Sequence, residues 1–182
     1  PAVIRSDPLV LHFESFLSYE EATAAAALLF KQGLFQKSKA GATAIGGTGL
    51  ERYSEANFCQ EKKCSEKKII KKIRSKAAAM MNLSLDNMEP MQATRYKPGM
   101  YYKTHHDNSG DFLLLPCGCR IYTMFVYLST PEGGATRFPR LKKQVAAKRG
   151  AAVVFANTRD DDPNMGDIRT EHEAMKVLGG VK

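Results

Sequence analysis

Three side chains in the second half of the chain have the types and spacing of a metal site. His105 and Asp107 are separated by one residue, and in an extended segment such residues project from the same face. His172 lies in a later strand-like segment. Two histidines and one carboxylate form the facial triad that binds iron(II) and leaves three coordination positions open. The pattern therefore indicates a mononuclear iron site suited to oxygen chemistry.

An H-x-D pattern is weak by itself, because it also occurs in ordinary polar turns. A second feature strengthens it: Lys182 follows His172 by ten residues. A strand returning over that interval would bring a cation beside the metal, where it could pair with a substrate carboxylate. We therefore treat His105, Asp107, His172 and Lys182 as one candidate site.

The N-terminal segments supply elements that could support such a site. Residues 9–13 are expected to form a short strand with Leu9, Leu11 and Phe13 on one face. The segment from Ser18 to Glu21 has the form of a capping box, which predicts a helix over about 19–31 that ends at Gly33. Residues 40–49, and the chain onward to about residue 64, lack a sustained period and are interpreted as loops and short strands.

A second helix is expected to start at a Ser65 cap and to end near Asn82. Its apolar residues follow the spacing of one buried helical face: Ile69, Ile70, Ile73, Ala77, Met80 and Met81. Eight basic residues interleave with them between residues 61 and 76 and supply much of the formal net charge of +8. We interpret this charge as a solvated helix face in preference to a nucleic-acid site.

From Met91 onward, short strand-like runs alternate with turn residues. Six segments are expected to be strands: 91–96, 100–105, 120–128, 135–138, 151–155 and 168–177. Strands without intervening helices favour a sandwich or jelly roll, with the two N-terminal helices covering the outside of one sheet. We expect an α+β protein with a single domain over 1–182, in which 1–90 is helical and loop support and 91–182 is the jelly-roll core.

Cysteine content and hydropathy leave the compartment undecided. Four cysteines are too few for a disulfide scaffold and do not match common zinc spacings, so the states of Cys59, Cys64, Cys117 and Cys119 stay open. No run of 18 apolar residues and no leader sequence is visible, so no membrane span is expected.

Several motifs carry a resemblance to a known family. The metal segment reads Y-K-P-G-M-Y-Y-K-T-H-H-D, a central strand R-I-Y-T-M-F-V-Y-L, a hairpin E-G-G-A-T-R-F-P, and the tail H-E-A-M-K-V-L-G-G-V-K. The order Arg52-Tyr53-Ser54 followed by Phe58 is similar to a substrate-side loop. Together these resemble the catalytic domain of prolyl 4-hydroxylases of the collagen and plant or algal type, within the iron(II)- and 2-oxoglutarate-dependent dioxygenases.

The resemblance implies a double-stranded β-helix (jelly-roll) core and assigns the site. Three residues would bind iron(II): His105, Asp107 and His172. Lys182 would hold the distal carboxylate of 2-oxoglutarate with Tyr96 and Thr136, and Thr123 would lie nearby. Tyr102 and Arg120 match positions that face the peptide, although an ordinary core tyrosine and surface arginine explain them equally well.

The implied reaction consumes O2, decarboxylates 2-oxoglutarate to succinate and hydroxylates peptidyl proline, with ascorbate (vitamin C) as reductant. The implied partner is a proline-rich, polyproline-II peptide bound by a monomer, and the family suggests the endoplasmic reticulum or secretory pathway. Nucleic acid is not an expected partner. Residues 173–176 depart from the family, which usually has small residues, cysteine and proline there, so the product exit could differ.

Two other functions stay open. The first is a 2-oxoglutarate oxygenase with another substrate, such as methylated nucleic acid, which the basic charge would suit. The second is a jelly-roll module that binds peptide without turnover. Neither His12 nor His106 is assigned a function, and Gly133-Gly134 is interpreted as a tight hairpin turn.

Overall fold

The computed structural model describes residues 1–31, 35–38, 52–108 and 117–182. Its helices are α1 (Tyr19–Lys31), α2 (Lys62–Ser65) and α3 (Lys68–Met81), with 3-10 turns η1 (Leu85–Asn87) and η3 (Ile168–Thr170). Its strands are β1 (Ala2–Ser6), β2 (Leu9–Phe13), β3 (Gln36–Lys37), β4 (Arg52–Tyr53), β5 (Glu55–Phe58), β6 (Gln92–Arg95), β7 (Tyr101–His105), β8 (Tyr122–Val126), β9 (Glu132–Gly133), β10 (Thr136–Phe138), β11 (Lys143–Val145), β12 (Ala152–Ala156), β13 (His172–Ala174) and β14 (Val177–Gly179).

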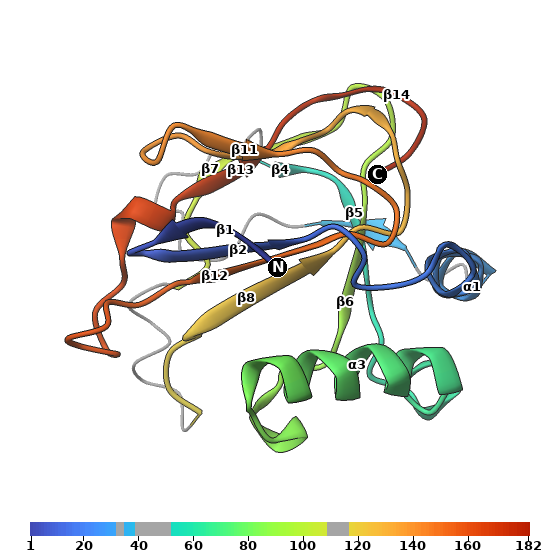
Figure 1. Ribbon diagram of the computed structural model, residues 1–182. Helices are drawn as coiled ribbons and strands as arrows, with labels where there is room; N and C mark the ends of the chain where they lie inside the picture. Colours follow the sequence, from blue (N-terminus) through green and yellow to red (C-terminus); the bar gives the residue numbers. More distant parts are fainter. Residues whose placement is uncertain (32–34, 39–51, 109–116) are drawn as a thin grey trace.

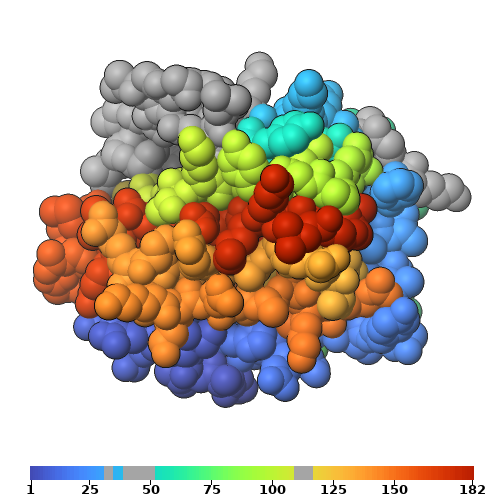
Figure 2. Space-filling model, turned by 90° about the horizontal axis from the view of Figure 1, so that it is seen from above, coloured from blue at the N-terminus to red at the C-terminus, as the bar shows by residue number. Residues whose placement is uncertain are grey.

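Two antiparallel sheets dominate the molecule (Figure 1). One has the strand order β1-β2-β12-β8, and the other has the order β11-β10-β13-β7-β4. Seen from above, β7, β13 and β10 follow one another across the second sheet in yellow-green, red and orange (Figure 2). Smaller sheets pair β14 with β9 and β5 with both β3 and β6. A chain of mostly sheets with few helices is consistent with a jelly-roll fold.

The main hydrophobic core joins the two large sheets. Val10, Val153 and Phe155 come from the four-stranded sheet, and Phe138 and Val145 come from the five-stranded sheet. All five side chains are at most 3% exposed. This packing fixes the facing strands on which the candidate site residues lie.

A second cluster connects the helices to the four-stranded sheet. Ala22 and Ala25 of α1 and Ile73 and Ala77 of α3 lie in one buried cluster with Ala152 of β12. In Figure 1, α3 lies beside β8 on the side away from β7 and β13. The helices therefore contact the sheet surface opposite the core.

The first strand and helix expected from the sequence are confirmed. Ser18 accepts a hydrogen bond from the Glu21 amide at 3.2 Å, and the Glu21 carboxylate accepts one from the Ser18 amide at 2.9 Å, as a capping box requires. In β2 the fully buried residue is Val10, on the face opposite Leu9 and Leu11. The expected stop at Gly33 and the expected loop at 40–49 lie outside the described residues.

The second helix ends as expected, but its start was predicted wrongly. Asn82 terminates α3 in the left-handed conformation with φ 51°. Ser65 instead closes α2, where its hydroxyl donates to the Glu61 carbonyl at 3.2 Å, and α3 starts after Lys67. The Cys59–Cys64 disulfide ties α2 to the chain that follows β5. Met80, expected on the buried face, is 37% exposed, and Ala78 is buried instead.

All six expected C-terminal segments contain strand residues, and in five of them the expected single strand is confirmed. The single strand expected over 168–177 was wrong, because the chain forms η3, then β13, then turns to pair β14 with β9. Gly133 and Gly134 have left-handed φ values of 72° and 65°, but the hairpin expected there was wrong, because β9 pairs with β14 while β10 pairs with β11 and β13. A Cβ atom on Gly133 would lie 2.7 Å from the Lys176 carbonyl, so this close approach requires glycine. Within the described ranges, no helix combines the length and apolar character needed to cross a membrane.

Candidate functional site

The three expected metal ligands meet at the end of one strand pair. His105 ends β7 and His172 begins β13, and the two are direct partners across the antiparallel ladder. Asp107 follows β7 and lies between the histidines, with carboxylate oxygens 3.5 Å from His105 Nε2 and 3.7 Å from His172 Nε2. One ligand atom from each residue lies within 4.8 Å of the others. The three side chains are therefore close enough to share one ion.

Both imidazole rings present the same nitrogen to this centre. His105 Nδ1 donates to the Lys103 carbonyl at 2.8 Å, and His172 Nδ1 donates to the Thr170 carbonyl at 3.2 Å. A carbonyl only accepts, so these contacts place the ring proton on Nδ1 and leave a lone pair on Nε2. The Nε2 atom of His172 is buried and has no hydrogen-bond partner among the described residues. A buried, unpaired nitrogen aimed at a carboxylate fits a metal ligand.

Asp107 is held in its ionised form. Burial favours the neutral acid, but His172, His105 and the Thr123 hydroxyl outweigh this and keep the pKa of Asp107 well below its usual range. Burial lowers the pKa of His172 to about 4. At neutral pH the site thus offers a carboxylate and a neutral imidazole, the forms that bind a metal.

The hydroxyl of Thr123 fixes the carboxylate. It donates to Asp107 Oδ2 at 2.8 Å and accepts from Asn157 Nδ2 at 2.8 Å. Thr123 was expected beside the cosubstrate, but its described contacts belong to the metal side of the site. Asn157 is fully buried and was not predicted from the sequence.

A second cluster surrounds Lys182. Its ammonium lies 3.5 Å from Thr136 Oγ1 and 5.4 Å from the centre of the Tyr96 ring. The main chains of Tyr96 and Lys182 exchange two hydrogen bonds of 2.9 Å. Burial lowers the pKa of Lys182 to about 8 and raises that of Tyr96 to about 12. The structure therefore brings together the three residues expected to hold a carboxylate.

Tyr127 belongs to this cluster and was missed. Its hydroxyl donates to Thr136 Oγ1 at 2.8 Å, and its ring lies 5.6 Å from the Lys182 ammonium. The available signal was the period of two along the central strand, which places Thr123, Phe125 and Tyr127 on one face. Phe125 on the same face contacts the His172 ring, with centroids 5.5 Å apart.

The two residues expected to face the peptide lie beside the triad. Tyr102 stacks on His105 with ring centroids 3.5 Å apart, and the Arg52 guanidinium lies 4.7 Å from the Tyr102 centroid. Arg120 donates to the Glu89 carboxylate at 2.5 and 3.0 Å and to the Asp107 carbonyl at 3.3 Å. Both side chains therefore contact triad residues and also have other protein partners.

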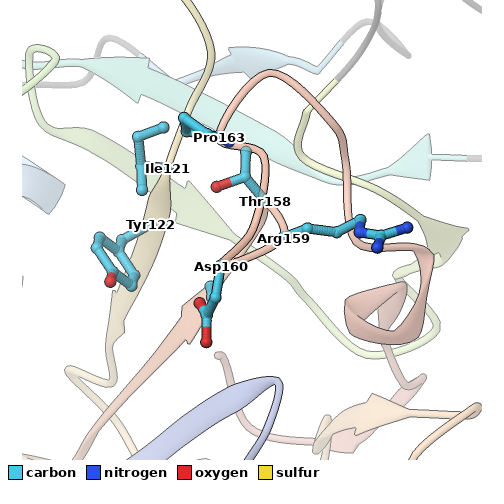
Figure 3. A pocket seen from close by; sticks show the side chains of 7 residues that line it. Ile121, Tyr122, Thr158, Arg159, Asp160 and Pro163 are labelled. Atoms are coloured by element: carbon cyan, nitrogen blue, oxygen red, sulfur yellow. The ribbon is translucent and has the colours of Figure 1, made fainter.

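A separate pocket lies at the ends of β8 and β12. Its lining includes Ile121, Tyr122, Thr158 and Pro163, and Figure 3 shows the side chain of Arg159 extending away from these residues. None of the metal-triad or lysine-cluster residues lines it. The pocket is adjacent to the candidate site, not part of it.

Two facing antiparallel sheets that carry a His-Asp-His centre and a buried lysine define a mononuclear metal-dependent oxygenase architecture. Residues 91–182 match the family model described as the 2OG-Fe(II) oxygenase superfamily. The chain belongs to this superfamily.

Within this superfamily, the chain is similar to several prolyl hydroxylases. The chain is 35% identical over 120 residues to prolyl 4-hydroxylase subunit alpha-2 of Caenorhabditis elegans and 34% identical over 129 residues to prolyl 4-hydroxylase 1 of Arabidopsis thaliana. Each match covers 63% of this chain but only 22% and 45% of those proteins. A solved structure of the viral collagen prolyl hydroxylase of Paramecium bursaria Chlorella virus-1, a 2OG complex, superposes with a TM-score of 0.74 at 29% identity, covering 95% of this chain and 91% of that one.

Proposed function

We propose that this chain hydroxylates proline in a peptide, using iron(II), 2-oxoglutarate and O2, with ascorbate as reductant. The observation that carries the proposal is that one chain contains both the His105-Asp107-His172 triad and the buried Lys182 cluster. Similarity to prolyl 4-hydroxylases over most of the chain supports the substrate class. Because the chain spans less than half of the length of the two curated relatives compared above, activity, substrate and partners are all part of this proposal.

We also propose a specific topology and domain extent for the fold. The core would be a double-stranded β-helix with the N-terminal helices packed on one sheet, and residues 1–182 would form one domain. The shared cluster of α1, α3 and β12 supports this arrangement. Strands β1 and β2 extend the sheet that contains β8 and β12, so residues 1–90 would contribute strands to the core as well as support.

In this proposal, His105, Asp107 and His172 hold iron(II), which supplies oxygen activation coupled to decarboxylation of 2-oxoglutarate when both are bound. Lys182 would pair with the distal carboxylate with help from the hydroxyls of Tyr96 and Thr136, and Tyr127 would orient the Thr136 hydroxyl through its hydrogen bond. A buried lysine without a carboxylate partner is costly, which favours binding of an anionic group here. The rings of Phe125, Phe138 and Phe155 pack around His172 and shield it from water.

The peptide would lie across the open side of the triad. The Tyr102 ring would pack on a proline ring, and Arg120 would donate to a peptide carbonyl. A proline-rich segment in the polyproline-II conformation suits such a site because little entropy is lost on binding. We propose that the protein acts as a monomer.

Succinate release tests this function. Protein loaded anaerobically with iron(II) would receive O2 and 2-oxoglutarate, with and without a polyproline or collagen-like peptide. We expect peptide-stimulated succinate and loss of it in His105→Ala and Asp107→Ala. Asp161→Ala is the matched control, because this exposed carboxylate contacts Arg159 and lies outside the site.

Other outcomes would contradict the proposal in distinct ways. Succinate release stimulated by methylated nucleic acid, and not by peptide, would indicate a demethylase. Peptide binding without succinate would indicate a binding module. Hydroxyproline detected in the peptide by mass spectrometry would identify the product directly.

A further inference from the structure

A buried carboxylate lies five residues before the His172 ligand. The side chain of Asp167 is 4% exposed, and its two oxygens receive hydrogen bonds from Arg169. The contacts are 3.0 Å from the main-chain amide, 2.9 Å from Nε and 2.7 Å from Nη2. Asp167 is also the N-cap of η3, the turn that leads into β13. The side chain therefore fixes the conformation of this turn.

The main chain of Asp167 reaches both segments that carry ligands. Its carbonyl accepts from the Thr170 hydroxyl at 2.9 Å and from His106 Nε2 at 3.0 Å. Thr170 in turn offers its carbonyl to His172 Nδ1. His106 stands between the ligands His105 and Asp107 in the sequence. One carbonyl thus connects the β7 side and the β13 side of the triad.

A second route runs from the same residue to the carboxylate ligand. The Asp167 amide donates to the Asn157 carbonyl at 2.8 Å. Asn157 holds Thr123, whose hydroxyl donates to Asp107. Asn157 and Thr170 are fully buried, so these bonds are shielded from water.

Arg169 ties this network to the N-terminal hairpin. Its Nη2 and Nη1 donate to the Asp7 carboxylate, in the turn between β1 and β2, at 2.8 and 3.3 Å. Asp7 is 70% exposed, so its part of the pair is screened by solvent. The buried contact to Asp167 is the stronger constraint.

A second arginine–aspartate pair in the same loop has the same sequence spacing but is exposed to solvent. Arg159 and Asp161 are also two residues apart and form two hydrogen bonds of 2.8 and 2.6 Å. Their side chains are 52% and 68% exposed. They serve as an internal comparison in the same loop.

We propose that Asp167 is a positioning residue for the metal centre, which sets the orientation of His172 and Asp107, and that Arg169 fixes Asp167 in this role. The proposal rests on the proposed function only in that the triad binds a divalent metal. Groups beyond the ligands commonly change metal affinity 10- to 100-fold when removed, roughly the range expected here.

Calorimetric titration with Co(II), an air-stable substitute for iron(II), tests the role on the full chain. We expect Asp167→Ala and Arg169→Ala to weaken Co(II) binding about 10- to 100-fold. Asp161→Ala should stay within about twofold of the unmodified protein. Unchanged Co(II) affinity in folded Asp167→Ala overturns the proposal, even if its Tm without metal is lower, because that result describes a stabilising role alone.

A conservative variant keeps the test decisive if Asp167→Ala does not fold. Asp167→Asn retains an acceptor for the Arg169 amide but loses the ion pair, so it should weaken Co(II) binding at least about threefold. Equal affinity in Asp167→Asn and the unmodified protein overturns the role. If the unmodified protein binds no more Co(II) than His105→Ala does, the proposed function itself fails.

Discussion

At the scale of single residues, each proposed metal ligand depends on a neighbour that fixes its chemical form. Main-chain carbonyls set the tautomers of His105 and His172, and the Thr123 hydroxyl occupies one side of the Asp107 carboxylate. These partners leave the ligand lone pairs directed at a common point. Ligand identity and ligand orientation are thus supplied by different parts of the sequence.

The Thr123 hydroxyl provides a first prediction. Thr123→Val keeps the shape but removes the donor to Asp107 and leaves Asn157 Nδ2 without its acceptor. We expect Co(II) affinity, measured by calorimetry, to fall about tenfold. Thr104→Val is the control, because that hydroxyl donates to Glu173 at 3.1 Å and touches no ligand. Equal affinity in the two variants would show that Asp107 needs no fixed donor.

Lys182 provides a second prediction, specific to the cosubstrate. Lys182→Ala removes the carboxylate partner but no metal ligand, so we expect the KM for 2-oxoglutarate to rise by at least about tenfold. Metal content of the loaded protein should stay unchanged. Succinate assays over a range of 2-oxoglutarate, with iron analysis of the same samples, measure both quantities. Parallel loss of metal and cosubstrate binding would contradict the assigned role.

At the scale of elements, the sequence was most informative where a pattern is local. The capping box at Ser18 and the end of the second helix near Asn82 are decided by residues within one helical turn, and both are confirmed. The two-residue strands β4 and β9 form only because each pairs with a strand far away in the sequence, β7 and β14 respectively. Tyr127 was missed for the same reason, since its role appears only when Thr136 and Lys182 lie beside it.

The candidate site shows the same difference between local patterns and contacts that form only on folding. The metal triad was predicted because its residues have distinctive types and spacing. The network through Asp167 and Asn157 was not, because aspartate and asparagine in a loop give no local sign of burial. Their function depends on hydrogen bonds to Thr170 and Thr123, which only the folded chain brings into contact.

The capping box at the start of α1 gives a third prediction. Ser18→Ala removes the acceptor for the Glu21 amide, so we expect the free energy of unfolding to fall by about 0.5 to 2 kcal/mol. Urea denaturation followed by circular dichroism measures this. Ser75→Ala, at an exposed position within α3, should not destabilise the protein, because alanine favours a helix interior. A destabilisation by Ser75→Ala equal to that by Ser18→Ala would argue against a specific cap.

The disulfide between Cys59 and Cys64 gives a fourth prediction. The Cys59–Cys64 disulfide closes a short loop, for which chain entropy predicts about 2 kcal/mol of stabilisation. Adding a reductant should lower the urea midpoint accordingly while leaving Co(II) affinity unchanged, because neither cysteine contacts the triad. A Cys59→Ala/Cys64→Ala variant should not respond to reductant. Cys117→Ser/Cys119→Ser should respond as the unmodified protein does, since both of these cysteines are free.

At the scale of the whole molecule, the facing sheets enclose charged groups that folding must remove from water. Asp107 is compensated by its neighbours, but Lys182 has only hydroxyl and aromatic neighbours among its described contacts. Such a cation lowers the stability of the fold unless an anion pairs with it. The proposed cosubstrate carboxylate would provide this pairing, so stability and cosubstrate binding should be coupled.

This coupling gives the last prediction, for protein without metal or 2-oxoglutarate. Lys182 loses its proton near pH 8 when folded, compared with 10.5 when unfolded. Folding therefore carries a cost that is constant below pH 8, shrinks between pH 8 and 10.5, and vanishes above that range. Lys182→Met should raise the free energy of unfolding at pH 7 by about 1 to 3 kcal/mol, with the smaller values reflecting partial solvent contact.

Urea denaturation of the two proteins across this pH range tests the sign as well as the size. The advantage of Lys182→Met should decline as the pH rises above 8. Exposed Lys176, replaced by methionine, should show no comparable pH-dependent gain. Adding 2-oxoglutarate with Co(II) should stabilise the unmodified protein more than Lys182→Met. If 2-oxoglutarate stabilised both proteins equally, Lys182 would not be the group that binds it. Another residue would then have to pair with its carboxylate.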